Sequence, residues 1–179
     1  MKKILRNKTI AAMKELPQAV KAEADSQLTQ RFTQLSAFQE AKTLATYLSM
    51  GHEFSTASLI QAALQDGKRV CVPRTYPQGR MEFVEYDPEI LEKTRFGLLE
   101  PNEQGKVVDK SEIDLIHVPG VVFQSEGYRI GYGAGYYDRY LADYSGKTVS
   151  TIYSIQEGEF QPDAFDIAVE EVLVYETHL

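Results

Sequence analysis

Short apolar segments of strand type alternate with helical segments along most of this chain, and that order restricts the possible folds. The strand-type segments are Thr43–Ser49, Arg69–Pro73, Met81–Tyr86, Leu115–Val118, Val121–Phe123, Thr148–Tyr153 and Val172–Tyr175. Strands separated by helices favour a mainly parallel sheet with helices on both faces. We therefore expect a three-layer α/β fold. Because no linker, repeat or low-complexity tract interrupts residues 1–179, we expect a single domain.

Helical periodicity is clearest near the N-terminus. Residues from Lys2 to Glu15 are expected to form one helix, which Pro17 ends before opening a second helix at its first turn. Apolar residues at helical spacing mark the buried face of this second helix: Val20, Ala24, Leu28, Phe32 and Leu35. A third helix is expected from a cap at Ser55 or Thr56 to Gly67, and a short one over Pro88–Lys93.

The overall composition excludes several classes of partner. The formal net charge of -7 argues against nucleic acid, because such partners favour a basic protein surface. No apolar run approaches the ~20 residues that a membrane helix needs, and no signal core follows the N-terminus. The single cysteine, Cys71, excludes an intramolecular disulfide framework and is expected in the core. We expect a soluble cytoplasmic protein without membrane contact, as a monomer or weak dimer.

The main functional signal is a glycine-rich segment, Gly127–Arg139, which reads GYRIGYGAGYYDR. It follows Phe123, where we expect the carboxyl end of a strand, the place where such sheets bind ligands. Alternate glycines let an anion approach several backbone N–H groups, and the positive end of the expected helix near Asp138–Ala142 adds to this. Neither the Walker pattern nor the dinucleotide fingerprint fits this spacing. The alternative is a tight turn whose glycines serve geometry alone.

A cluster of cations opens the chain: Lys2, Lys3, Arg6, Lys8 and Lys14. All of them precede the first acid, Glu15. Positive charge at a helix N-terminus opposes the helix dipole, and residues four apart share one helical face. The cluster therefore indicates a polyanionic partner such as a nucleotide triphosphate. The alternative is a solvated, frayed terminus.

The segment Gly131–Arg139, preceded by Arg129, closely resembles the signature of the 5-formyltetrahydrofolate cyclo-ligases. Weaker matches follow the same order along the whole chain: Lys2-Lys3-Ile4-Leu5-Arg6, Tyr47–Met50 with Glu53 and Thr56, Gly97–Pro101 and Val118–Gly120. The resemblance implies a ligase that uses ATP and Mg²⁺ to convert 5-formyltetrahydrofolate into 5,10-methenyltetrahydrofolate, with release of ADP and phosphate.

The same resemblance implies the site residues. The ATP-binding residues would be Lys2, Lys3, Ile4, Leu5, Arg6, Arg129, Ile130, Gly131, Tyr132, Gly133, Ala134, Gly135, Tyr136 and Tyr137. The folate-binding residues would be Arg6, Met50, Tyr132, Gly133, Ala134, Gly135 and Tyr136. Asp138 and Asp166 match magnesium ligands. The chain departs from the family pattern at Phe165, where a histidine is common, at Glu170, where aspartate is usual, and at Ser55, where an acid is often found.

The implied reaction needs no protein nucleophile. The formyl oxygen attacks the γ-phosphate, which gives an imidate-like phosphate, and the neighbouring nitrogen then closes the ring as phosphate leaves. Phosphoryl transfer depends mainly on positioning and on neutralising charge. We therefore assign Lys2, Arg6 and Arg129 to phosphate charge, with Arg6, Arg129 and Tyr136 as the catalytic residues. Mg²⁺ prefers carboxylate oxygens such as those of Asp138 and Asp166.

Several of these residues also have a structural interpretation. Asp138 and Asp166 fit helix or turn caps, Met50 fits a core methionine, and at least one of Tyr136 and Tyr137 is expected to pack in the core. The histidines show no metal-ligand spacing and are expected to be structural or surface residues: His52, His117 and His178.

Two other functions fit the same patterns. One is an enzyme on a related α/β scaffold that acts on a sugar phosphate or a coenzyme A ester without hydrolysing ATP. The basic N-terminus favours ATP over these ligands, because a triphosphate needs more positive charge. The other is a nucleotide- or folate-binding module without catalysis, which the paired acids disfavour because a binder has less need of magnesium.

Overall fold

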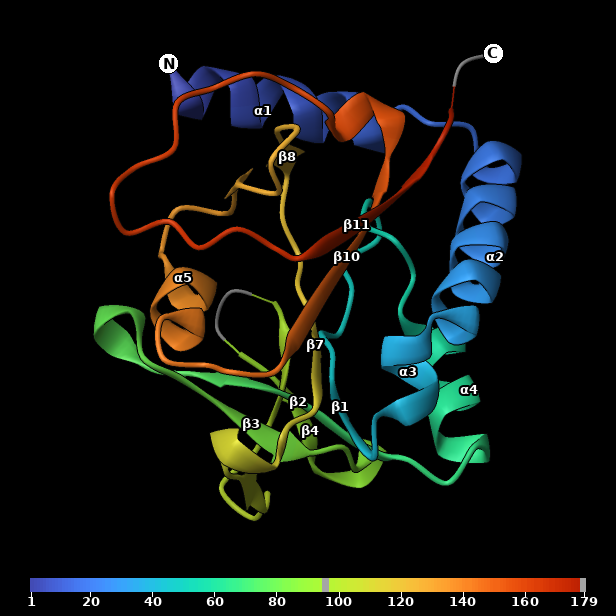
Figure 1. Ribbon diagram of the computed structural model, residues 1–179, viewed down its shortest axis with the longest axis vertical. Helices are drawn as coiled ribbons and strands as arrows, with labels where there is room; N and C mark the ends of the chain where they lie inside the picture. Colours follow the sequence, from blue (N-terminus) through green and yellow to red (C-terminus); the bar gives the residue numbers. More distant parts are fainter. Residues whose placement is uncertain (95–96, 178–179) are drawn as a thin grey trace.

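A seven-stranded sheet forms the centre of the protein in the computed structural model, which describes residues 1–94 and 97–177 (Figure 1). The strands lie in the order β11–β10–β7–β1–β2–β3–β6. Their bounds are Thr43–Ala45 for β1, Arg69–Thr75 for β2, Met81–Glu85 for β3, Val107–Val108 for β6, Leu115–His117 for β7, Lys147–Tyr153 for β10 and Glu171–Tyr175 for β11. Neighbouring strands from β11 to β2 pair parallel, while β3 and β6 are added antiparallel at one edge. The expected mainly parallel sheet is therefore confirmed.

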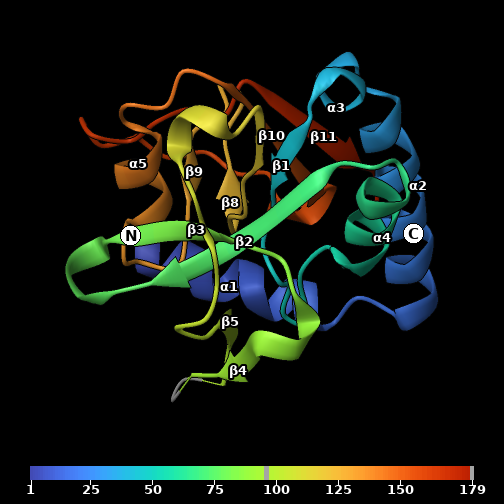
Figure 2. The same ribbon diagram turned by 90° about the horizontal axis from the view of Figure 1, so that it is seen from below.

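Helices cover both faces of this sheet, as expected. Three of them, α2, α3 and α4, lie on one face, and α5 lies on the other (Figure 1, Figure 2). Their bounds are Gln18–Gln34 for α2, Ser36–Glu40 for α3, Ala57–Gln65 for α4 and Tyr136–Leu141 for α5. Each face has its own core because side chains alternate along a strand. Leu44 of β1 belongs to the core that contains Phe32 of α2, whereas its neighbour Ala45 belongs to the core that contains Leu141 of α5.

The periodicity of the second helix predicts its buried face correctly. Ala24, Leu28 and Phe32 are fully buried, and Val20 and Leu35 are half-buried at its two ends. The helix begins directly after Pro17, whose fixed φ suits this position.

Helix α1 (Lys2–Lys14) lies across the edge of the sheet at which the parallel strands end (Figure 1). Its first turn contains no acid and its N-cap makes no side-chain hydrogen bond, so the cations there oppose the helix dipole. Tertiary packing offsets this cost. Leu5 and Ile10 pack against a small core formed by Val121, Val122 and Ile130.

The hairpin of β8 (Val122–Phe123) and β9 (Arg129–Ile130) is antiparallel and separate from the main sheet. The expectation that a strand of the parallel sheet leads directly into the glycine loop is therefore wrong. Because the hairpin follows β7 and packs on α1, it still brings the loop to the carboxyl edge. Gly127 turns the hairpin with φ 91°, and its carbonyl accepts a hydrogen bond from the backbone N–H of Val169 at 2.9 Å. A Cβ at Gly127 would lie 2.3 Å from the Val169 carbonyl oxygen, so the turn admits no side chain.

The expected short helix over Pro88–Lys93 does not form. Only Pro88–Ile90 makes a 3₁₀ turn, which the Asp87 side chain caps. The residues that follow form strand β4 (Leu91–Lys93), because they pair antiparallel with β5 (Leu99–Pro101). Among the helices of the described residues, none has the length and apolar character to cross a bilayer.

Cys71 and His117 are titratable side chains that lie inside the protein. Cys71 is fully buried, as expected, and burial raises the pKa of its thiol to about 12. His117 is also fully buried, and its two ring nitrogens lie 2.9 Å from the hydroxyls of Thr46 and Thr151. Three rings surround it: Phe32, Tyr47 and Phe54. Burial lowers the pKa of His117 to about 3, so the structural interpretation is confirmed for this histidine. His178 lies outside the described residues.

The buried histidine makes stability depend on pH. Between about 6.5 and about 3, the unfolded chain binds a proton at His117 that the folded core excludes, so the free energy of unfolding should fall as the pH drops through this window. One such proton contributes about 1.4 kcal/mol per pH unit. Urea unfolding at several pH values should therefore give a shallower dependence for His117→Gln than for the unsubstituted protein. Equal slopes would contradict this account.

Candidate active site

Two predicted phosphate-binding elements meet at the carboxyl ends of the parallel strands. Arg6 of α1 donates a hydrogen bond from Nε to the carbonyl oxygen of Gly131 at 2.7 Å, although 125 positions separate them in the sequence. This contact joins α1 to the glycine loop, which we define as residues 131–135. The candidate site is the region formed by α1, the glycine loop, residues 48–56 after β1 and residues 163–167 before β11.

The glycine loop is exposed, and its backbone adopts conformations that favour glycine. Gly133 has φ 107° and Gly135 has φ 73°, where other residues would be strained. All four residues from Tyr132 to Gly135 are exposed. In the part of the chain that the structure describes, their backbone N–H groups donate to no backbone carbonyl. The loop therefore presents unpaired amides to solvent, which is the property of an anion-binding nest.

Helix α5 begins with two tyrosines, and both pack against the core of their face. The helix starts at Tyr136, earlier than expected, and is only six residues long, so its dipole adds little to the loop. The Tyr136 hydroxyl donates to the carbonyl oxygen of Tyr76 at 3.3 Å. The Tyr137 hydroxyl is buried and has no hydrogen-bond partner among the described residues. Since buried hydroxyls are normally paired, this group is a donor that a water molecule or a ligand can satisfy.

Arg129 lies beneath the glycine loop, with 4% of its side chain exposed. Its guanidinium donates to Asp138 Oδ1 at 3.1 Å, to the Pro119 carbonyl at 3.1 Å and to the Ile167 carbonyl at 3.4 Å. The structure thus brings Arg129 to the candidate site, but its Nε and Nη1 groups are engaged within the protein. It ties together the β7–β8 connection, α5 and the segment before β11.

One predicted metal ligand, Asp138, binds the short segment that contains the other, Asp166. Asp138 Oδ1 accepts a hydrogen bond from the backbone N–H of Ile167 at 3.0 Å, and Asp166 is the residue before it. Asp166 Oδ2 accepts from the backbone N–H of Asp163 at 2.8 Å and lies 4.0 Å from Lys2 Nζ, which also pairs with Asp163 Oδ2 at 3.2 Å. Asp138 is not a helix cap, because Gly135 is the N-cap of α5. The described residues hold no cluster of three or more histidine, cysteine or acidic side chains that would bind a metal alone.

The remaining predicted ATP-binding residues of α1 and the hairpin fall into two pairs, one exposed and one packed between the two elements. Lys3 and Ile4 are exposed on α1. Leu5 and Ile130 pack in the small core between the helix and the hairpin, so they hold the two elements together.

A buried carboxylate connects the segment after β1 to the glycine loop. Glu53 is 5% exposed and accepts hydrogen bonds from the backbone N–H of Met50 at 2.7 Å and from the Tyr132 hydroxyl at 3.1 Å. The same hydroxyl lies 2.9 Å from Nε2 of His52. Burial raises the pKa of Glu53. Met50 is half-buried and belongs to none of the hydrophobic cores of the described chain, which argues against a core methionine.

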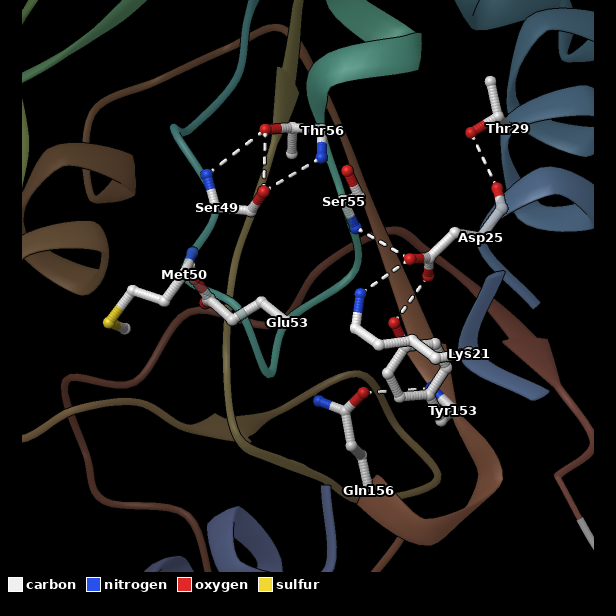
Figure 3. Close-up of polar contacts among 10 residues, drawn as sticks. All are labelled: Lys21, Asp25, Thr29, Ser49, Met50, Glu53, Ser55, Thr56, Tyr153 and Gln156. Carbon is white, nitrogen blue, oxygen red and sulfur yellow. Dashed lines mark hydrogen bonds and ion pairs between the residues drawn. The ribbon is translucent and has the colours of Figure 1, made fainter. Parts of the chain in front are cut away.

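Figure 3 shows a second carboxylate at this end of the sheet, that of Asp25 on α2. Its Oδ1 accepts a hydrogen bond from the Tyr153 hydroxyl at 2.5 Å. Its Oδ2 accepts from Lys21 Nζ at 2.7 Å and from the backbone N–H of Ser55 at 3.3 Å. Asp25 therefore places an acid beside Ser55, whereas the family resemblance leads one to expect an acid at position 55 itself.

Asp25 is an acid that the sequence patterns do not single out, whereas Glu53 is named only within the family motif that includes Tyr47–Met50 and Thr56. Glu53 stands directly before Phe54, and Asp25 follows Ala24 on the buried face of α2. An acid beside a core position is a weak signal of a buried carboxylate, because the groups that bind it lie far away in the sequence.

Comparison with known proteins relates the whole chain to one family. The model of the 5-formyltetrahydrofolate cyclo-ligase family matches residues 1–174. A 5-formyltetrahydrofolate cyclo-ligase of Haemophilus influenzae is 32% identical over 161 residues, which cover 85% of this chain and 86% of that protein. The solved structure of Aquifex aeolicus 5,10-methenyltetrahydrofolate synthetase has a TM-score of 0.84 at 30% identity and covers 97% of this chain and 89% of its own. The corresponding Mycoplasma pneumoniae structure, at 22% identity and a TM-score of 0.81, covers 96% of this chain and 97% of its own and shares the fold.

The ion pair beneath the loop should be important for stability. Asp138→Ala removes the carboxylate that faces a nearly buried guanidinium, and breaking such a pair costs about 3 kcal/mol or more. Urea denaturation should show this loss in the free energy of unfolding. Asp143→Ala is the matched control, because Asp143 is 79% exposed and pairs with Lys110 at the surface. Similar losses for the two variants would contradict a special role for the Arg129 pair.

Proposed function

The chain belongs to the 5-formyltetrahydrofolate cyclo-ligase family and is a ligase, and on that basis we propose that it uses ATP and Mg²⁺ to cyclise 5-formyltetrahydrofolate. The products would be 5,10-methenyltetrahydrofolate, ADP and phosphate. The observation that carries the ATP dependence is the hydrogen bond between Arg6 and Gly131, which joins a cationic helix to a loop of unpaired amides. Neither element alone provides both mobile positive charge and fixed donors for a polyphosphate.

The chain's own residues fit a nucleotide. When bound, ATP supplies the γ-phosphoryl group that turns the formyl oxygen into a leaving group, through a phosphorylated, imidate-like form of the substrate. The amides of Tyr132–Gly135 would hold phosphate oxygens, and Lys2 and Arg6 would neutralise their charge. Arg129 adds positive potential from beneath the loop and keeps the loop in place. The sugar-phosphate and coenzyme A alternatives have no feature in their favour that compares with the cationic helix.

The acids fit Mg²⁺ when a polyphosphate is present. Both hydrogen bonds of Asp138 within the described chain use Oδ1, so Oδ2 is available to a cation. Asp166 lies beside the same backbone segment. Mg²⁺ is commonly held by one or two carboxylates together with phosphate oxygens and water, so two acids suffice. The ion would stabilise negative charge on the phosphates during transfer.

The substrate would lie between the glycine loop and the segment after β1. Met50 offers a half-buried apolar side chain there, and Tyr132 and Tyr136 offer rings and hydroxyls. Asp25 and Glu53 form the polar floor on this side. Cytoplasmic location, the absence of a nucleic-acid partner, and a monomeric or weakly dimeric state stay expectations from the sequence.

One assay tests this function. Protein, 5-formyltetrahydrofolate, ATP and Mg²⁺ are mixed, and the absorbance of the methenyl product is followed beside ADP release. Product that forms only with ATP supports the ligase. Tight binding of folate or nucleotide without turnover would instead indicate a binding module.

Arg6→Ala should weaken ATP use far more than it weakens folding. Removal of one preorganised donor to a charged centre typically lowers the rate about 100-fold, so we expect kcat/KM for ATP to fall by about that factor. Lys8→Ala is the matched control, because Lys8 carries the same charge on the same helix but is exposed and, in the described part of the chain, makes no hydrogen bond to the glycine loop. Steady-state kinetics and melting temperatures should be compared. A loss of activity that only parallels a loss of stability would count against the phosphate role.

Asp166→Asn should raise the Mg²⁺ concentration needed for half-maximal activity, because the amide is a weaker ligand for a hard cation. Asp163→Asn is the control, since both acids lie near Lys2 but only Asp166 is proposed as a ligand. A magnesium titration of the three proteins decides the question. An unchanged titration for Asp166→Asn would remove this residue from the metal site.

A further inference from the structure

We propose that Tyr132 and Glu53, with His52 orienting the Tyr132 hydroxyl, form a relay that takes up the proton released when the folate ring closes. The inference rests on the proposed function and adds a proton-transfer role to the same site. None of the three residues is in the set proposed to hold the phosphates through charged side chains, and only Tyr132 is expected to touch the substrate.

The relay runs from a buried acid to an exposed ring. The Tyr132 hydroxyl carries one proton and donates it to Glu53 Oε2 at 3.1 Å. The Tyr132 oxygen can then accept a second hydrogen bond. His52 Nε2 lies 2.9 Å from it and must therefore carry the proton of this bond and donate it. Tyr132 is 42% exposed and lies in the glycine loop, whereas Glu53 is 5% exposed. One hydroxyl therefore connects a carboxylate inside the protein with the open side of the candidate site.

A structural role for Glu53 explains only half of these contacts. Oε1 accepts from the backbone N–H of Met50, and the Glu53 N–H donates to the Met50 carbonyl at 3.0 Å, which together close a local turn. Oε2 has no part in that turn. It binds Tyr132, which is 79 positions away in another loop. A carboxylate that only capped the turn would not need this second, hydroxyl-bearing partner.

Ring closure releases one proton that the nucleophile must lose. The substrate's amine nitrogen forms a bond to the activated formyl carbon, and its N–H proton passes to the Tyr132 oxygen. The proton of the Tyr132 hydroxyl passes at the same time to Glu53 Oε2. The bond between that carbon and the phosphorylated oxygen then breaks, and its electron pair leaves with phosphate. Glu53 afterwards returns its proton through the Tyr132 hydroxyl to water, which reaches this exposed side chain when the product leaves, so no other reactant is needed.

The surroundings shift the pKa values of Glu53 and His52 in the directions that the relay needs. The titratable groups that face Glu53 or His52 come from several packed elements and are Lys14, Lys21, Tyr47, Tyr132, Tyr137 and Tyr153. Burial raises the pKa of Glu53, which favours transient protonation. Burial, together with Lys14 and Lys21, lowers the pKa of His52, so its ring is mainly neutral near pH 7 and adds no positive charge beside the Tyr132 oxygen that receives the proton.

The test separates phosphoryl transfer from ring closure in a single turnover. Glu53→Gln keeps the size of the side chain but cannot take up a proton. With excess enzyme, ATP and Mg²⁺, we expect ADP to appear at close to the rate of the unsubstituted protein, while the methenyl product forms about 100-fold more slowly. Glu53→Asp, which retains a carboxyl group, should recover part of the rate. The product-forming step of the unsubstituted protein should also slow towards acid pH, and Glu53→Gln should lack this dependence.

Tyr132→Phe provides a second, independent variant if Glu53→Gln folds poorly, because its side chain lies in an exposed loop. It should show the same separation of ADP from product. Tyr144→Phe is its matched control, since that hydroxyl also donates to backbone carbonyls but lies outside the candidate site. Equal slowing of ADP and product in both relay variants, or unchanged product formation, would overturn the relay. If the unsubstituted protein itself makes no methenyl product with ATP, the proposed function fails instead, so the two failures are distinguishable.

Discussion

The common direction of the five parallel strands is the constraint on which the rest of the molecule depends. Because β1, β2, β7 and β10 run the same way, the segments that follow them emerge at one edge of the sheet. Three features lie at that edge. The buried acid Glu53 follows β1, the hairpin that leads to the glycine loop follows β7, and the turn that contacts α1 follows β10. Helices on both faces bury the sheet, so this edge is where backbone and polar side chains meet solvent.

Helix α1 shows how tertiary packing can override an unfavourable local charge pattern. Its cations oppose its own dipole, yet Leu5 and Ile10 fasten it to the hairpin, and Arg6 reaches the glycine loop. The same contacts that hold the helix therefore hold positive charge beside a row of unpaired amides. The packing that offsets the electrostatic cost of the cations in α1 is therefore the same packing that positions those cations for the proposed binding of phosphate.

Local patterns in the sequence predict the elements whose signals are local. Helical periodicity in α2 and the glycine spacing of the loop depend on neighbouring residues, and both agree with the structure. Pairing partners are not encoded locally, so the sequence does not reveal that β8 leaves the main sheet or that Leu91–Lys93 pairs as a strand. The approach of Asp25 to Ser55, and of Glu53 to Tyr132, depends on the complete fold for the same reason.

The turn at Gly127 limits how far this sequence can diverge. Its missing side chain makes room for the carbonyl of Val169, and its own carbonyl binds the amide of the same residue. Two backbones, rather than two side chains, are in contact here, so no compensating substitution at position 169 can restore the space that a larger residue would fill. The segment that carries Asp166 is therefore restricted by Gly127, which lies 42 positions before Val169 (169 − 127), and the two regions can diverge only in ways that preserve this contact.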